Sequence, residues 1–276
     1  MGRVHHTVPT PDSLGLIAGN GRYPFLVVEE ARRAGVKKIV AAAFEHETDA
    51  GLAEIVDEIH WMRVGQLTRL LSCFQKAGLA NAIMAGQIAP KNLFDLRPDV
   101  KSLLLLARLK KRNAETIFGA IADELAGVGV TVLPALTFLE GFIATKGLIA
   151  GREPSAREAD DIAFGFSIAR EVSRLDIGQT VLVRKGTVVA VEAFEGTNEA
   201  IKRGGALARK GAVMVKVAKP NQDLRFDVPV IGLETVRIAA EAHVRVIALE
   251  AGRTLLLEKA ELIAFASRAN VSIVGG

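Results

Sequence analysis

Short apolar segments alternate with helical patterns through the first half of this sequence. Five of these segments have the length and composition of buried strands, at 14–18, 38–44, 59–64, 81–85 and 130–133. Helical periodicity follows three of them and ends near a glycine each time, at 24–34, 66–77 and 114–126. This alternation predicts an α/β fold, in which a Rossmann-like parallel sheet is covered by helices.

The pattern changes at 145–155, where Gly147, Gly151 and Pro154 interrupt it. We interpret this segment as a linker. Ser155 then begins a helix, because Glu158 three residues later completes a capping box. Further strand patterns occur at 180–183, 188–192, 213–217, 244–249 and 254–258. We therefore predict a Rossmann-like N-terminal domain at 1–145 and a distinct C-terminal α/β domain at 146–276.

Composition limits the function classes. Half of the 276 residues are hydrophobic, so the chain can bury a substantial core. Cys73 is the one cysteine, which excludes an internal disulfide and suits a reducing, cytoplasmic compartment. No apolar run approaches 18 residues, so we expect no membrane span. One Trp and one Tyr give no stacking platform, and we expect no nucleic-acid partner.

The segment 219–232 gathers most of the chemistry in one loop. Pro220 and Pro229 prevent a helix or a central strand. Between and beside them lie Lys219, Gln222, Asp223, Arg225 and Asp227. Cations and carboxylates in a stiff loop can bind an anion and a metal, or activate a water molecule. A solvated charged loop is the alternative interpretation.

The first strand ends in Gly19, Asn20 and Gly21, and a later strand ends in Gly86 and Gln87. Small residues between a strand and a helix allow backbone N–H groups to hold a phosphate. The dinucleotide fingerprint is incomplete, because Pro24 occupies the position of its third glycine. A tight strand-to-helix turn explains the same residues equally well.

Two further groups of polar residues follow elements of the second half. Asp176 and Gln179 lie between a helix and a strand, and Glu195, Gly196 and Thr197 follow a later strand. Their carboxylate, amide and hydroxyl groups suit a phosphate, a sugar or a hydrated metal ion. Alternatively, Thr197 caps the next helix.

The segment 103–112 is apolar and then basic. Such a segment can lie against an anionic membrane surface. A core helix with a solvated basic end is the alternative.

Together these pieces resemble one family, the UDP-2,3-diacylglucosamine pyrophosphatases of the LpxI type, which act in lipid A biosynthesis. The resemblance begins at Leu14 and spans nearly the whole chain, through 14–21, 176–179, 191–197, 219–222 and 225–232. It implies a Rossmann-like domain, a distinctive C-terminal α/β domain, and an active site between them. It also implies hydrolysis of UDP-2,3-diacylglucosamine to UMP and 2,3-diacylglucosamine 1-phosphate (lipid X), with water attacking the phosphorus on the lipid-sugar side.

The resemblance implies a divalent metal, usually Mg²⁺, and assigns the essential acid to Asp227, which could hold the metal or orient water. The other candidate residues become substrate-binding, namely Gly19, Asn20, Gly21, Gly86, Gln87, Asp176, Gln179, Glu195, Gly196, Thr197, Lys219, Gln222 and Arg225. A substrate with acyl chains implies peripheral contact with the cytoplasmic face of the inner membrane. A homodimer is left open.

The sequence departs from the family at 113–115, where Asn-Ala-Glu replaces a frequent Gly-Asp-Asp, and at Asn198, where Asp is common. Two other classes remain alternatives. One is a non-hydrolytic or redox nucleotide-binding Rossmann-type protein, and the other is a lipid-binding protein without catalysis.

Overall fold

A computed structural model describes residues 10–88, 98–111, 113–220 and 223–276. The chain forms two compact units. The first comprises Met1–Leu139 together with Asp223–Asp227, and the second comprises Glu140–Gln222 and Val228–Gly276.

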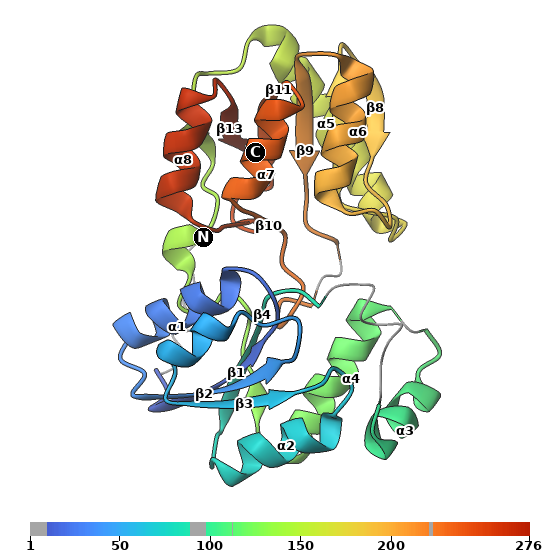
Figure 1. The fold of residues 1–276 in the computed structure, drawn as a ribbon. Helices are drawn as coiled ribbons and strands as arrows, with labels where there is room; N and C mark the ends of the chain where they lie inside the picture. Colours follow the sequence, from blue (N-terminus) through green and yellow to red (C-terminus); the bar gives the residue numbers. More distant parts are fainter. Residues whose placement is uncertain (1–9, 89–97, 112, 221–222) are drawn as a thin grey trace, which may run out of the picture. The chain divides into compact units, whose positions relative to one another are not determined.

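The first unit contains a five-stranded parallel sheet (Figure 1). Its strands are β1 (Ser13–Ala18), β2 (Lys38–Phe44), β3 (Glu58–Met62), β4 (Asn81–Ala85) and β5 (Thr131–Val132). Their order is β3-β2-β1-β4-β5, and every pair is parallel. This is the order of a doubly wound, dinucleotide-binding type of sheet. The predicted α/β class and the parallel N-terminal sheet are confirmed.

Helices lie on both faces of this sheet. They are α1 (Tyr23–Arg33), α2 (Leu67–Lys76), α3 (Val100–Arg108) and α4 (Ala114–Gly127). Figure 1 shows α1 and α2 on opposite sides of the sheet. Phe74 of α2 and Leu125 of α4 are fully buried against one face. Cys73 belongs to the same core, and burial raises the pKa of its thiol to about 11, so it is no nucleophile.

The second unit contains a six-stranded mixed sheet of order β6-β13-β11-β9-β7-β8. Its strands are β6 (Gly147–Ala150), β7 (Thr180–Arg184), β8 (Thr187–Val191), β9 (Ala212–Lys216), β11 (Val244–Leu249) and β13 (Ser272–Gly275). The central strands β9, β11 and β13 are parallel, and β7 runs antiparallel to β9. The short strands β10 (Val230–Ile231) and β12 (Leu255–Leu256) pair separately. Short 3₁₀ helices lie at Ala50–Glu54 and Glu140–Phe142.

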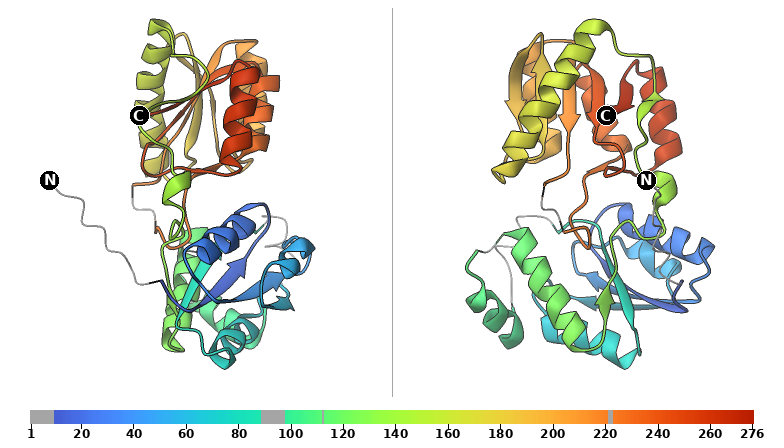
Figure 2. Two further views of the ribbon diagram at one scale, coloured as in Figure 1. Left: turned by 90° about the vertical axis from the view of Figure 1, so that its left-hand side faces the viewer. Right: turned by 180° about the vertical axis from the view of Figure 1, so that it is seen from behind.

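The helices of the second unit divide between the two faces of its sheet, as Figure 2 shows. They are α5 (Ala156–Arg174), α6 (Thr197–Ala208), α7 (Leu233–Glu241) and α8 (Lys259–Arg268). Strand side chains alternate between the faces, so Val215 packs with α5 whereas Met214 packs with α6 to α8. The capping box predicted at Ser155 and Glu158 begins α5.

The segment 145–155 was predicted to be a linker. That prediction is wrong for Gly147–Ala150, which form strand β6. Gly147, the first residue of β6, and Gly151, which follows the strand, adopt positive φ, and β6 pairs antiparallel with β13 at the edge of the sheet. These glycines mark the bends around an edge strand. The units divide between Leu139 and Glu140, a few residues before the predicted boundary.

The loop expected to belong to the second domain returns in part to the first. The segment Asp223–Asp227 belongs to the first unit, where Phe226 packs in the core formed by α2 and α4. The backbone N–H of Ala135 also donates to the carbonyl of Leu224 at 2.7 Å. The sequence pattern gave no sign of this excursion.

Candidate active site

In the first unit, the two glycine-containing turns at the carboxyl ends of β1 and β4 clasp each other. Asn20 donates its N–H to the carbonyl of Gln87 at 2.8 Å, and Gly19 donates to Ala85 at 2.8 Å. A Cβ atom on Gly19 would lie 2.5 Å from the carbonyl oxygen of Gln87. Glycine is therefore required here by the close approach of two backbones.

These hydrogen bonds bear on the phosphate-binding role that we expected for the turn after β1. The N–H groups of Gly19 and Asn20 already donate to protein carbonyls, so they cannot hold a phosphate at the same time. The side chains of Asn20 and Gln87 are exposed and remain able to contact a ligand. Any anion binding by this turn would thus depend on side chains and on Gly21, whose φ is +87°.

The segment that carries Asp227 is closed by hydrogen bonds of its side chains and its backbone. The guanidinium of Arg225 donates to both carboxylate oxygens of Asp223, from Nη2 at 2.7 Å and from Nε at 3.0 and 3.1 Å. The N–H groups of Phe226 and Asp227 donate to the carbonyl of Asp223, at 3.2 and 3.0 Å. Arg225 holds the pKa of Asp223 below its usual value, through hydrogen bonding first. Asp227 is thereby held at the end of a closed turn.

In the second unit, a buried polar cluster lies at the end of β9. Lys216 is only 2% exposed, and its Nζ donates to Thr197 Oγ1 at 2.8 Å and to Thr180 Oγ1 at 3.3 Å. Thr197 in turn donates to Glu192 Oε1 at 2.7 Å. Glu192 Oε2 lies 3.9 Å from Lys216 Nζ. The hydroxyl of Thr197 therefore bridges a buried ammonium and a buried carboxylate.

Lys216, Glu192 and Thr180 were not among the predicted site residues. A signal was present, because Lys216 is the one charged residue within the apolar run 212–217, and Glu192 ends another apolar run. A charged side chain that ends a buried strand must find a partner. Two acceptors in this region, Gln179 Oε1 and Glu192 Oε2, are buried and have no hydrogen bond within the described residues.

The other predicted residues of the second unit lie around the same edge of the sheet. Lys219 Nζ pairs with Asp176 Oδ1 at 2.8 Å. Glu195 is exposed, and its ion pair with Arg203 lowers the pKa of its carboxyl. Gly196 precedes α6 with a φ of +83°. Gln222 lies outside the described residues.

Asn113 caps α4, since its side chain accepts the N–H of Thr116 at 3.0 Å. The family departure at this position therefore has a structural use. Within the described ranges, no group of three or more His, Cys, Asp or Glu side chains could hold a metal ion. A metal at Asp227 would need ligands from elsewhere, and the phosphate oxygens of a substrate are the chemical class that supplies them to Mg²⁺.

Comparison with known proteins agrees with the resemblance. The LpxI N-terminal domain matches residues 13–142, and the LpxI C-terminal domain matches residues 145–274. The UDP-2,3-diacylglucosamine pyrophosphatase LpxI of Caulobacter vibrioides is 28% identical over 273 residues, which are 95% of this chain and 96% of that protein.

A solved structure of the biotin carboxylase domain of 2-oxoglutarate carboxylase from Hydrogenobacter thermophilus is 15% identical, with a TM-score of 0.28. That match covers 67% of this chain and 36% of the carboxylase chain, and the likeness is too low to bear on fold or function. The two domain matches together span nearly the whole chain and occur in the order that the family requires. The chain therefore belongs to the LpxI family.

Proposed function

We propose that this chain hydrolyses the diphosphate of UDP-2,3-diacylglucosamine, releasing UMP and 2,3-diacylglucosamine 1-phosphate in the cytoplasm. The observation that carries the proposal is the match to both LpxI domains along the chain. Asp227, the acid that the resemblance implies, lies in a loop that Asp223 and Arg225 close. The full-length match to a pyrophosphatase of that name supports the substrate class.

Asp227 is proposed as the residue that orients or deprotonates the attacking water, which adds to the phosphorus on the lipid-sugar side. Positioned general bases contribute about 10²–10⁴ in rate. Lys219 and Arg225 would offset negative charge on the phosphate oxygens. Arg225 can do so while it binds Asp223, because its guanidinium has five N–H donors and uses only Nε and Nη2 for that carboxylate. Gln179 Oε1 offers a buried acceptor for a sugar or ribose hydroxyl.

Mg²⁺ is proposed as the cofactor. Its chemistry, when bound, is to neutralise developing charge on phosphate oxygens. Asp227 is the residue of this chain that would hold it, together with oxygens of the substrate. This arrangement suits Mg²⁺, which often takes only one or two carboxylates from the protein.

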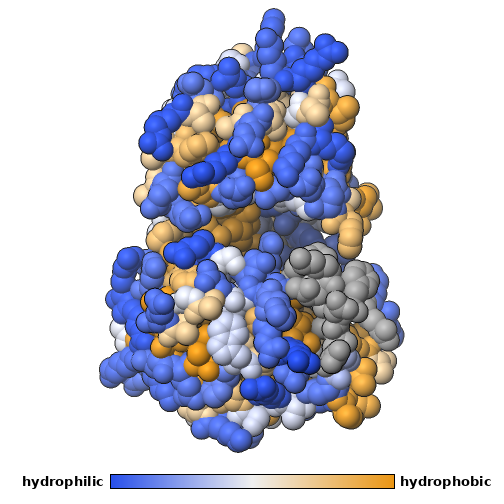
Figure 3. All heavy atoms as spheres, viewed as in Figure 1, coloured by the Kyte–Doolittle hydropathy of each residue, from blue (hydrophilic) through white to orange (hydrophobic). Residues whose placement is uncertain are grey.

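A lipid substrate requires contact with a membrane or with acyl chains. None of the helices in the described part of the chain is long and apolar enough to cross a membrane. Helix α3, however, turns an apolar stripe to solvent, since Val100, Leu103 and Leu104 are 73%, 53% and 55% exposed. Figure 3 shows apolar surface at the lower right, where α3 lies in Figure 1. We propose that α3 and the basic residues after it make peripheral contact with the inner membrane.

The test is incubation with UDP-2,3-diacylglucosamine and Mg²⁺, with and without NADH, in water enriched in ¹⁸O. The proposal predicts UMP release that is independent of NADH and lost on chelation, with the label in 2,3-diacylglucosamine 1-phosphate. Tight binding without UMP release would favour the lipid-binding or nucleotide-binding alternatives. Label in UMP would contradict the proposed point of attack.

A further inference from the structure

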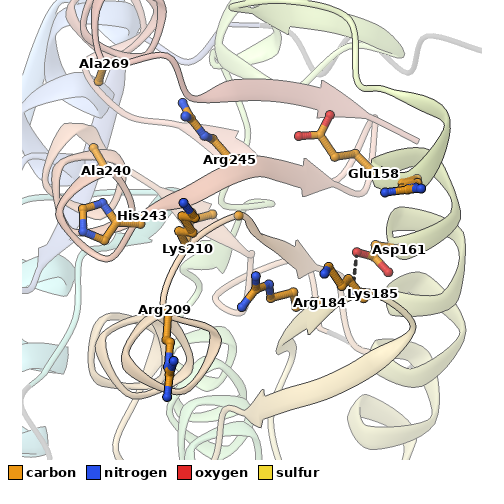
Figure 4. Close-up of a pocket in the computed structure, with 13 residues that line it drawn as sticks. Glu158, Asp161, Arg184, Lys185, Arg209, Lys210, Ala240, His243, Arg245 and Ala269 are labelled. Carbon is orange, nitrogen blue, oxygen red and sulfur yellow. Dashed lines mark hydrogen bonds between the residues drawn. The ribbon is translucent and has the colours of Figure 1, made fainter.

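A basic groove lies at the end of the second sheet where β9 and β11 begin. Its volume is about 620 Å³, which is the size of a small-ligand pocket. Lys216 marks the other end of β9, so the groove and the buried polar cluster lie at opposite edges of one sheet. Residues from α5, α7, the β7–β8 hairpin and the segments at the start of β9 and β11 line it, together with Ala269 just after α8 (Figure 4).

The lining is strongly positive. Its cations are Arg157, Arg184, Lys185, Arg209, Lys210 and Arg245, and its carboxylates are Glu158 and Asp161. This excess of four positive charges equals the net charge of the whole chain, +4 with neutral histidines. Lys and Arg therefore equal Asp and Glu in number over the rest of the protein.

Both carboxylates of the groove already bind other groups of the protein. Asp161 is 6% exposed and accepts the backbone N–H groups of Lys185 and Gly186, at 2.8 and 2.7 Å. Glu158 pairs with Arg152 at 2.8 Å and completes the capping box of α5. Neither carboxylate neutralises a side chain of the groove in the described structure. Arg184 and Arg245 donate to the backbone carbonyls of Ala208 and Asn270, which engage these side chains but do not neutralise their charge.

Three of the turns around the groove place a basic residue where backbone geometry favours glycine. Lys185, Arg209 and His243 have φ of +50°, +64° and +55°. Lysine and arginine are uncommon at positive φ, and glycine would be favoured at these positions by the backbone alone. Figure 4 shows Arg184, Lys185, Lys210 and His243 around the start of β9, whereas the guanidinium of Arg209 points away from them.

From this geometry we propose that the groove binds a compact, multiply charged phosphate anion, such as the di- or triphosphate group of a soluble metabolite. Cations from separate elements around one concave site suit several phosphate oxygens at once. His243 is the one aromatic residue in the lining, so the groove has no platform for stacked bases. Its apolar residues are small or buried, unlike the large exposed side chains with which basic surfaces enter a bilayer.

Inorganic tripolyphosphate is the probe, titrated calorimetrically into the full-length protein at about 0.15 M salt. The variant Lys185→Gly/Arg209→Gly removes two cations at positions that glycine prefers, so its melting temperature should not fall. The control Lys146→Gln/Lys202→Gln removes two exposed cations of the same unit outside the groove. Both variants should release UMP at the wild-type rate, because the groove lies outside the proposed catalytic machinery.

The proposal predicts saturable binding that weakens about tenfold in the groove variant and is unchanged in the control. Equal weakening in both variants would show that binding depends only on the net charge of the protein, and it would contradict a site in the groove. Absence of saturable binding to the wild type would also overturn it. Flotation with phosphatidylglycerol vesicles separates the sources of phosphate. Vesicle binding that needs Lys185 and Arg209, without tripolyphosphate binding, would replace the soluble ligand with a lipid headgroup and contradict the proposal.

Discussion

The ring of Phe226 packs against the ring of Phe118, with centroids 5.7 Å apart and planes inclined by 41°. Phe118 belongs to α4 of the first unit, whereas the chain on either side of Asp223–Asp227 belongs to the second unit. The contact therefore anchors Phe226, which directly precedes Asp227, in the core of the first unit.

Replacing Phe226 with alanine should loosen this anchor. We expect a loss of about 2 kcal/mol in the free energy of unfolding, because the ring is partly buried and pairs with one other ring. UMP release should slow as well, because Asp227 would lose its fixed position. Urea denaturation and initial rates measure the two effects. Phe194→Ala is the matched control, since that ring is 82% exposed and its loss should change stability by under about 0.5 kcal/mol. Wild-type turnover in Phe226→Ala would refute the anchoring role.

Lys216→Met should destabilise the second unit by about 3 kcal/mol, because Glu192 would remain buried without its ammonium. The double variant Lys216→Met/Glu192→Gln should recover part of that loss, since no uncompensated charge remains. Urea denaturation of the single and double variants gives the coupling free energy. Lys202→Met, on the exposed face of α6, controls for the loss of a lysine. If the losses in the free energy of unfolding were strictly additive, Lys216 and Glu192 would not stabilise each other, and the prediction would be wrong.

The capping box of α5 should make stability depend on pH. Arg152 and Ser155 lower the pKa of Glu158 from 4.5 to about 2 in the folded protein, so its stabilisation is present above pH 4.5 and is lost as the pH falls toward 2. Glu158→Gln should therefore cost about 1 kcal/mol at pH 7. The difference from the wild type should shrink steadily below pH 4.5. A cost that stays constant down to pH 2.5, measured by denaturation, would contradict this assignment.

The exposed stripe of α3 should be needed for membrane contact. Leu103→Ser/Leu104→Ser should weaken flotation with anionic liposomes, and Lys110→Glu/Lys111→Glu should do so in a salt-dependent way. Leu207→Ser is the control, because that residue is 65% exposed on α6 of the other unit. Equal flotation of all variants would leave α3 as an ordinary surface helix.

Local patterns predicted much of the fold. The apolar runs and glycine-terminated helices became β1, β2, β4, α1 and α2, because burial on both faces of a parallel sheet leaves a strong sequence signal. Strand β6 was missed, since three residues between two glycines look like a break. The edge strand pairs with β13, more than a hundred residues later.

The candidate site was predicted less completely. Asp227 and Arg225 stood out as charges between prolines, but nothing local indicates that Phe226 packs into the first unit. Lys216 looked like the end of a strand, and its role depends on Thr197 and Glu192 from other elements. Such relationships are set by tertiary contacts, which a single sequence does not display.

The most direct test of the proposed function is the rate of UMP release by Asp227→Ala, measured beside Asp223→Ala with UDP-2,3-diacylglucosamine and Mg²⁺. We predict that Asp227→Ala loses at least about 10²-fold in turnover, while its melting temperature and substrate affinity stay close to the wild type. Asp223→Ala should instead lose stability along with rate, because it breaks the turn closed by Arg225. A near-normal rate of UMP release by Asp227→Ala would contradict the central claim.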